Sequence, residues 1–204
     1  MDMISTNNYI RLCGVMAAAP AFSHASRNQS FLAFPLEVQR LSGNIDTLNV
    51  IVRPQQLAAV KITEQSKLCV TGQLRSFNNR HGDGAKLIIS VFARELTLAE
   101  ESDCNLVRLS GTLCKSPTLR TTPMGRDICD LMLAVNRHYG RSDYLPCICW
   151  GALAKKAALL DVGSRLQLEG RIQSRHYIKL TEEGPVEKTA YEVSVTELSA
   201  LSPE

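Results

Sequence analysis

Aromatic and basic side chains share one stretch of this chain, and together they could hold a flat, negatively charged ligand. Tyr144, Ile148 and Trp150 have the same parity in a segment that alternates like a β-strand, so we expect them to project from one face. The intervening apolar residues would then face a core. Aromatic rings stack on unpaired bases, and Lys and Arg attract phosphates. The competing interpretation is ordinary, because a single Trp or Tyr more often belongs to a core.

Further candidates of both kinds surround this face. Tyr139 and Tyr177 are expected in neighbouring hairpins and complete a set of four candidate stacking residues with Tyr144 and Trp150. The candidate phosphate-binding residues are Arg120, Arg126, Arg137, Arg141, Lys155, Lys156, Arg171, Arg175 and Lys179. Lys155 and Lys156 fall on an expected helix and could equally form its solvated side.

The distribution of charge agrees with a polyanionic ligand. Residues 104–179 contain 12 Lys and Arg against five Asp and Glu, whereas residues 180–204 contain one against six. A basic block of this kind attracts nucleic acid, although an ordinary solvated surface has the same composition.

The seven cysteines and the remaining motifs point away from metal binding and catalysis. Six of the cysteines, among them Cys13 and Cys69, lie in apolar, strand-like stretches and are expected to be buried filler. An odd count without a signal-peptide pattern favours a reducing cytoplasm. No C-x-x-C pair, phosphate-binding glycine loop or nucleophile elbow occurs, so we expect no metal, no cofactor and no enzymatic activity.

An internal repeat sets the organisation of the chain. Twelve residues between Asn8 and Ile51 recur at a constant offset of 97, including Gly14 with Gly111 and Asp46 with Asp143. After a slip of one residue, Gly72 recurs as Gly170. We therefore predict two copies of one domain, at 1–101 and 102–204.

Each copy has the same expected order of elements. In the second copy, strands are predicted at 106–113, 128–136, 144–150, 165–175 and 189–196, with a helix at 152–160. In the first copy, the helix opens at Pro54 and the last hairpin turns at 81–84. Five strands with one helix between the third and fourth predict a mainly β fold class, with two tandem OB-fold barrels that bind strands of nucleic acid or sugar.

Five blocks of the second copy resemble the bacterial single-stranded DNA-binding proteins. They begin at Asn105, Ser116, Leu133, Cys149 and Glu169 and follow the order and approximate spacing of that family. The resemblance implies non-enzymatic binding of single-stranded DNA, with base stacking at the four aromatic positions named above. The whole chain also resembles the family members that have two OB-folds per chain. This resemblance implies a homodimer of four barrels and roles in replication, recombination, repair or replication restart.

The first copy departs from the aromatic pattern. Ser42, Thr47 and Arg53 stand where the second copy has Tyr139, Tyr144 and Trp150, and Asn79 lies near the counterpart of Tyr177. We expect this degenerate OB-fold to act as a scaffold or dimerisation partner with weak phosphate contact. The candidate basic residues of this copy are Arg27, Arg40, Arg53, Arg75, Arg80 and Lys86.

A second class of function stays open at this stage. The sequence ends soon after the last predicted strand, without the acidic tail typical of the family, which puts recruitment of partners through a tail in doubt. The alternative is an OB-fold interaction module of a replication or restart complex, with DNA binding secondary. The expected location is the bacterial cytoplasm, in association with the nucleoid, without membrane attachment.

Overall fold

The computed structural model describes residues 7–60, 62–63, 65–79, 87–100, 102–138, 140–181 and 184–201, with the side chains of Lys179 and Thr181 excepted. They form two compact units. One, here called the N-terminal barrel, contains residues 9–75 and 89–106. The other unit is here called the C-terminal barrel. Its described residues are 7–8, 76–79, 87–88 and those between 107 and 201.

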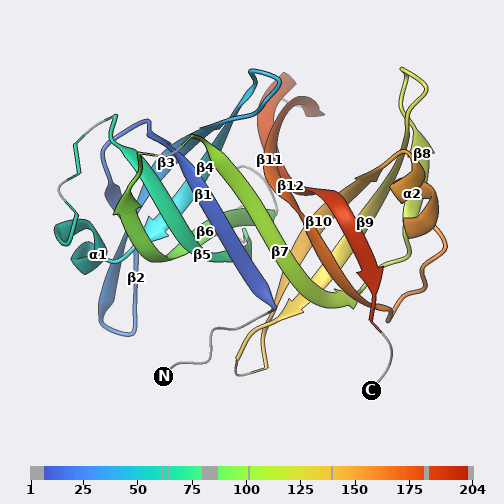
Figure 1. The fold of residues 1–204 in the computed structure, drawn as a ribbon, viewed down its shortest axis with the longest axis horizontal. Coiled ribbons are helices and arrows are strands. Elements are labelled where there is room, and N and C mark those ends of the chain that lie inside the picture. Colours follow the sequence, from blue (N-terminus) through green and yellow to red (C-terminus); the bar gives the residue numbers. More distant parts are fainter. Residues whose placement is uncertain are drawn as a thin grey trace. The chain divides into compact units, whose positions relative to one another are not determined.

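The N-terminal half of the chain forms six strands and one short helix. These elements are β1 (Asn8–Met16), β2 (Ala21–Ser26), β3 (Gln29–Gln39), β4 (Ile45–Val52), α1 (Pro54–Ala58), β5 (Lys67–Asn78) and β6 (Leu87–Leu98). The strands lie in the order β2-β3-β4-β6-β5-β1, and a further pairing of β1 with β3 closes the barrel (Figure 1). β4 and β6 run parallel, while the pairs β1–β5, β2–β3 and β3–β4 are antiparallel.

The C-terminal half repeats this plan. Its elements are β7 (Cys104–Leu113), β8 (Thr118–Thr121), β9 (Asp127–Asn136), β10 (Ser142–Trp150), α2 (Ala152–Ala157), β11 (Arg165–Thr181) and β12 (Gly184–Ala200). The order is β8-β9-β10-β12-β11-β7, with β7 and β9 also paired. The predicted mainly β architecture of two OB-fold barrels is therefore confirmed, including the helix between the third and fourth barrel strands.

Apolar residues of one parity fill the two cores. Leu12, Leu36 and Leu48 are fully or almost fully buried in the N-terminal barrel, as are Leu109 and Leu145 in the C-terminal barrel. Leu36, Leu48, Leu109 and Leu145 alternate with more exposed neighbours, as expected for strands with one face on an apolar interior.

Close contact between strands explains two of the repeated glycines. A Cβ atom on Gly14 would collide with the carbonyl oxygen of Glu37, and one on Gly111 would lie 2.5 Å from that of Ala134. Both contacts lie where the first strand of a barrel meets the strand that closes it. Only glycine leaves room for such an approach of two backbones.

The structure differs from the sequence prediction in five elements. The short strands β2 and β8 were not predicted, α2 ends at Ala157 rather than at residue 160, and β11 and β12 extend well past the predicted limits. The added length forms a hairpin arm in which β11 and β12 stay paired up to Thr181 and Gly184. The turn predicted at 81–84 lies outside the described residues.

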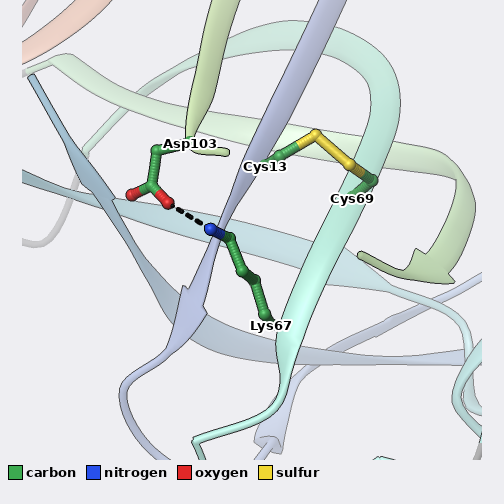
Figure 2. The surroundings of a disulfide bond; sticks show 4 residues. All are labelled: Cys13, Lys67, Cys69 and Asp103. Atoms are coloured by element: carbon green, nitrogen blue, oxygen red, sulfur yellow. Dashed lines mark ion pairs between the residues drawn. A yellow bond between two sulfur atoms is a disulfide. The ribbon is translucent and has the colours of Figure 1, made fainter. Parts of the chain in front are cut away.

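The interpretation of Cys13 and Cys69 as free, buried filler was wrong. They form a disulfide between β1 and β5, shown in Figure 2 beside the ion pair of Lys67 and Asp103. The antiparallel register sets the two cysteines directly opposite each other, which brings their side chains together. The disulfide also removes the argument for a reducing compartment that rested on the cysteine pattern. The five other cysteines are not disulfide-bonded.

Candidate nucleic-acid interface

Strand β10 presents two aromatic side chains on the outer face of the C-terminal barrel. Tyr144 is 47% exposed and Trp150 is 39% exposed, and Ile148 is buried between them. The alternate residues Leu145, Cys147 and Cys149 are buried on the opposite, inner side. The predicted division of this strand into two faces is therefore confirmed. Trp150 is opposite Ile128 of β9, and Tyr144 is opposite Ala134.

The hairpin arm carries Tyr177 on the same outer face. The registers join Ile148 to Ser194 and Ser194 to Arg171, so Arg171 shares the face of Ile148. Along β11, Arg175 and Tyr177 have the parity of Arg171 and extend this face into the arm. The guanidinium carbon of Arg175 lies 5.5 Å from the centre of the Tyr177 ring, within the range of a cation–π interaction.

Arg137 is held by a buried carboxylate and does not extend freely from this face. Its Nε donates to Asp143 over 2.8 Å, its Nη2 donates to the other carboxylate oxygen, and Nη2 also donates to the carbonyl of Ser76. The Asp143 side chain is fully buried. These contacts favour a positioning role for Arg137 over the phosphate contact expected from sequence.

The same pair recurs in the N-terminal barrel. Arg40 donates through Nε and Nη2 to the two carboxylate oxygens of Asp46, and the Asp46 side chain is fully buried. A buried charge needs such a partner, because losing hydration without compensation is costly. This explains why both residues of the pair are identical in the two copies of the repeat.

Ser76 and Phe77 contribute to the C-terminal barrel although the repeat assigns them to the first copy. The backbone N–H of Ser76 donates to Asp143 over 2.6 Å, and its hydroxyl accepts from the backbone N–H of Tyr144 over 2.7 Å. Arg137 lies over the Phe77 ring, with 5.4 Å from the guanidinium carbon to the ring centre. Sequence reasoning missed both residues, since no local pattern connects them with Tyr144.

The remaining basic candidates fall into two groups. Arg120 forms an ion pair with Asp130, and Lys155 forms a looser one with Asp127 at 3.4 Å. The hydrogen bond from Arg120 to Asp130 raises the pKa of the guanidinium, despite partial desolvation. Within the described part of the C-terminal barrel, the exposed candidates with no ion pair are Arg126, Arg141, Lys156, Arg171 and Arg175.

Several candidates lie outside what the structure describes. These are Tyr139, Arg80, Lys86 and the side chain of Lys179. In the N-terminal barrel, Arg53 is exposed just before α1, and Arg75 donates a hydrogen bond to Gln73. Of the sequence-predicted stacking set, the structure therefore brings Tyr144, Trp150 and Tyr177 onto one face.

The buried thiols of β10 have raised pKa values and stay protonated at neutral pH. Desolvation, with a contribution from neighbouring Cys129, raises the pKa of Cys149 to about 12, and burial raises that of Cys147 further. Among the described residues, no group of three or more His, Cys, Asp and Glu side chains could hold a metal ion. Nor does that part of the chain include a helix with the length and apolar character needed to cross a membrane.

Comparison with known proteins shows what the C-terminal part of the chain is similar to. Residues 104–201 match the single-strand binding protein family. Single-stranded DNA-binding protein 2 of Listeria innocua is 40% identical over 80 residues, which cover 36% of this chain and 50% of that protein. The single-stranded DNA-binding protein of Bacillus cereus is 37% identical over 105 residues, covering 48% and 57%. The chain spans about half the length of the curated relatives it matches.

A solved structure extends the similarity to both barrels. The wild-type single-stranded DNA-binding protein from Thermus aquaticus matches with a TM-score of 0.75 and 22% identity, over 97% of this chain and 94% of that one. A deletion mutant of the same protein matches equally well. These similarities establish the two-barrel fold.

Proposed function

We propose that the chain binds single-stranded DNA with little sequence preference, because residues 104–201 match the single-strand binding protein family. The observation that carries the proposal is the outer face of the C-terminal barrel. Tyr144, Trp150 and Tyr177 share this face and are at least partly exposed. Stacking on such rings tolerates every base, because each base has a π-face.

Unpaired cations on the same barrel supply the second part of the proposed mechanism. Arg171 and Arg175 are exposed on the face of Tyr177, and Arg126, Arg141 and Lys156 add positive charge elsewhere on the barrel surface. Contacts of Lys and Arg with phosphates release counterions, so the affinity should fall as salt rises. Arg120 and Lys155 would have to exchange a carboxylate partner for a phosphate.

The two barrels are proposed to contribute unequally to DNA contact. The division at residues 101 and 102 assigns most of the DNA contact to the second copy and a scaffold or dimerisation role with weaker contact to the first. By the same family relation, we propose a homodimer of four barrels that acts in replication, recombination, repair or replication restart, in association with the bacterial nucleoid. Sedimentation of the intact chain at the mass of a monomer would contradict the dimer.

The test is a titration of the intact chain with a thymidine oligonucleotide, followed by the fluorescence of Trp150. The chain contains one Trp, so the signal has a single source. We expect quenching that weakens between 50 mM and 200 mM salt, the range over which several phosphate contacts lose affinity steeply. A labelled oligonucleotide that shows no change in anisotropy with the same protein would refute DNA binding altogether.

One observation favours a second candidate function, a protein-interaction module. Ile178 and Leu180 are strongly exposed on the side of the hairpin arm opposite to Tyr177. Exposed apolar side chains of this kind mark contact surfaces for other proteins. In that case Trp150 emission would stay constant during the titration, and Ile178→Ser would impair binding of the partner without changing DNA affinity.

A further inference from the structure

The N-terminal barrel contains an aromatic cluster that the comparison of the two repeats does not show. His24 of β2 stacks on Phe31 of β3, with 4.9 Å between the ring centres and 16° between their planes. The Phe92 ring of β6 also lies beside Phe31, with 5.5 Å between the ring centres and a tilt of 52° between their planes. Three rings from three strands thus form one continuous group.

The strand registers place this cluster on the outer face of its barrel. Ala33 has the parity of Phe31 and is opposite Ile51, which in turn is opposite Phe92. The core residues Phe34 and Val50 have the other parity. The cluster therefore lies on the side of the sheet away from the core. It spans strands β2, β3, β4 and β6, which are neighbours in the sheet.

The corresponding face of the C-terminal barrel is the one that carries Trp150. By the repeat offset, Phe31 corresponds to Ile128, which is opposite Trp150, and Arg53 corresponds to Trp150 itself. By strand register, Phe92 takes the place of Ser194. The second barrel has an aromatic residue at the end of β10, whereas the first barrel has aromatic residues on the strands next to the corresponding position.

The exposure of the rings shows which of them could meet a ligand. Phe31 is only 7% exposed, because it lies beneath His24 and Phe92, and both of these are partly exposed. The outer side of the imidazole and the Phe92 ring are thus the available surfaces. Phe31 supports them from below.

The charges around the cluster favour a polyanion. Arg53 is exposed at the end of β4, and Arg94 is exposed with the same parity as Phe92, two residues further along β6. Arg27 is exposed in the β2–β3 turn. None of the three forms an ion pair among the residues that the structure describes. Aromatic surfaces surrounded by unpaired Arg are the combination that single-stranded nucleic acid requires.

We propose that the cluster of His24, Phe31 and Phe92 is a second base-stacking site, occupied by a further segment of single-stranded nucleic acid. The inference rests on the proposed function and adds residues through which the first barrel contacts bases. Arg53 and Arg94 would contact the phosphates that flank the stacked base. The first barrel then binds at positions displaced from those used by the second.

A tryptophan introduced at this site gives a direct test in the intact chain. The double variant Trp150→Phe with Phe92→Trp retains one indole, located in the proposed site. A long thymidine oligonucleotide should quench its emission, whereas an oligonucleotide too short to occupy both barrels should quench it less. Emission that stays constant while a labelled long oligonucleotide binds would overturn the second site and leave the proposed function intact.

The chain offers a matched control on the same hairpin. Phe22 is 67% exposed and opposite Leu32, while His24 is opposite Phe31, so a register shift turns Phe22 to the other side of the sheet. Trp150→Phe with Phe22→Trp should therefore show little quenching by the same long oligonucleotide. Quenching equal to that of the Phe92→Trp variant would contradict the proposed location.

Loss of the exposed ring provides a second readout. His24→Ala should weaken binding of the long oligonucleotide about fivefold or more, the effect of losing one stacked base, and leave binding of the short one unchanged. Arg94→Gln should reduce the salt dependence of long-oligonucleotide binding. If His24→Ala and Arg94→Gln both leave these quantities at the wild-type values, the site is refuted. If no oligonucleotide binds the wild-type chain, the proposed function itself fails.

Discussion

The two exposed rings of β10 should contribute to DNA binding independently of each other. Tyr144 and Trp150 lie six residues apart on one strand, which corresponds to about 20 Å at about 3.3 Å per residue. One base cannot contact both rings across that distance. The variants Trp150→Ala and Tyr144→Ala should therefore each remove the stacking of a different base.

The expected magnitudes follow from this separation. Loss of one stacked base costs about 1–3 kcal/mol, or about 5-fold to 150-fold in Kd. Because sites separated by more than about 10 Å usually act additively, the double variant should lose the sum of the two single effects within about 0.5 kcal/mol. Trp150→Phe should lose less than Trp150→Ala, since a phenyl ring still offers a stacking surface.

Fluorescence anisotropy of a labelled thymidine oligonucleotide measures all these affinities, including those of variants without Trp. Leu119→Ala is a suitable control, because Leu119 is exposed on β8 and opposite the buried Cys129, away from the aromatic face. A wild-type Kd for both single variants would show that the stacking face is misplaced. A coupling energy well above 0.5 kcal/mol would refute independent stacking, and would mean that the strand bends to bring both rings to one segment.

Three further predictions concern stability. Asp143→Asn should destabilise the C-terminal barrel by about 3–5 kcal/mol, because it breaks a buried ion pair. Asp130→Asn, in an exposed ion pair, should cost no more than about 1 kcal/mol. Urea unfolding followed by Trp fluorescence measures the stability of both variants. Replacing Cys13 and Cys69 by Ser should lower stability by up to about 4 kcal/mol, given their sequence separation of 56, and an unchanged thermal midpoint by circular dichroism would argue against the disulfide. Burial raises the pKa of the Cys149 thiol from 9.0 to about 12. As pH rises above 9 this thiol therefore ionises in the unfolded chain before it does in the folded one, and the folded state loses stability. The urea midpoint of Cys149→Ala should accordingly fall less between pH 8 and pH 10.5 than that of the wild-type chain.

The alternation of buried and exposed residues and the internal repeat were sufficient to predict the two barrels and the aromatic face of β10. Leu145 and Cys147 alternate with Tyr144 and Ile148 over several residues, and a strand with one buried face leaves a single arrangement for such a pattern. The repeat then extended the same arrangement to the first copy. The aromatic face of β10 followed from these two regularities.

Long-range pairing explains what the sequence did not predict. The partner of Cys13 depends on the register between β1 and β5, and the Arg137 side chain turns to a carboxylate that only the fold brings beside it. The cluster around Phe31 was missed for a related reason. Comparing equivalent positions shows that an aromatic residue is absent at Arg53, but not that rings from adjacent strands replace it.

Ser76 shows that the unit that was duplicated and the unit that folds are different. By sequence, Ser76 ends a strand of the first copy, yet its backbone and hydroxyl pair with Asp143 and Tyr144 of the second. A chain cut at the repeat boundary would leave a buried carboxylate and a strand N–H of the second copy without these partners. The second copy has thus come to depend on a residue of the first, so deleting the first half would not recover a complete single barrel. Stable one-barrel fragments would need Ser76 transferred with the second copy.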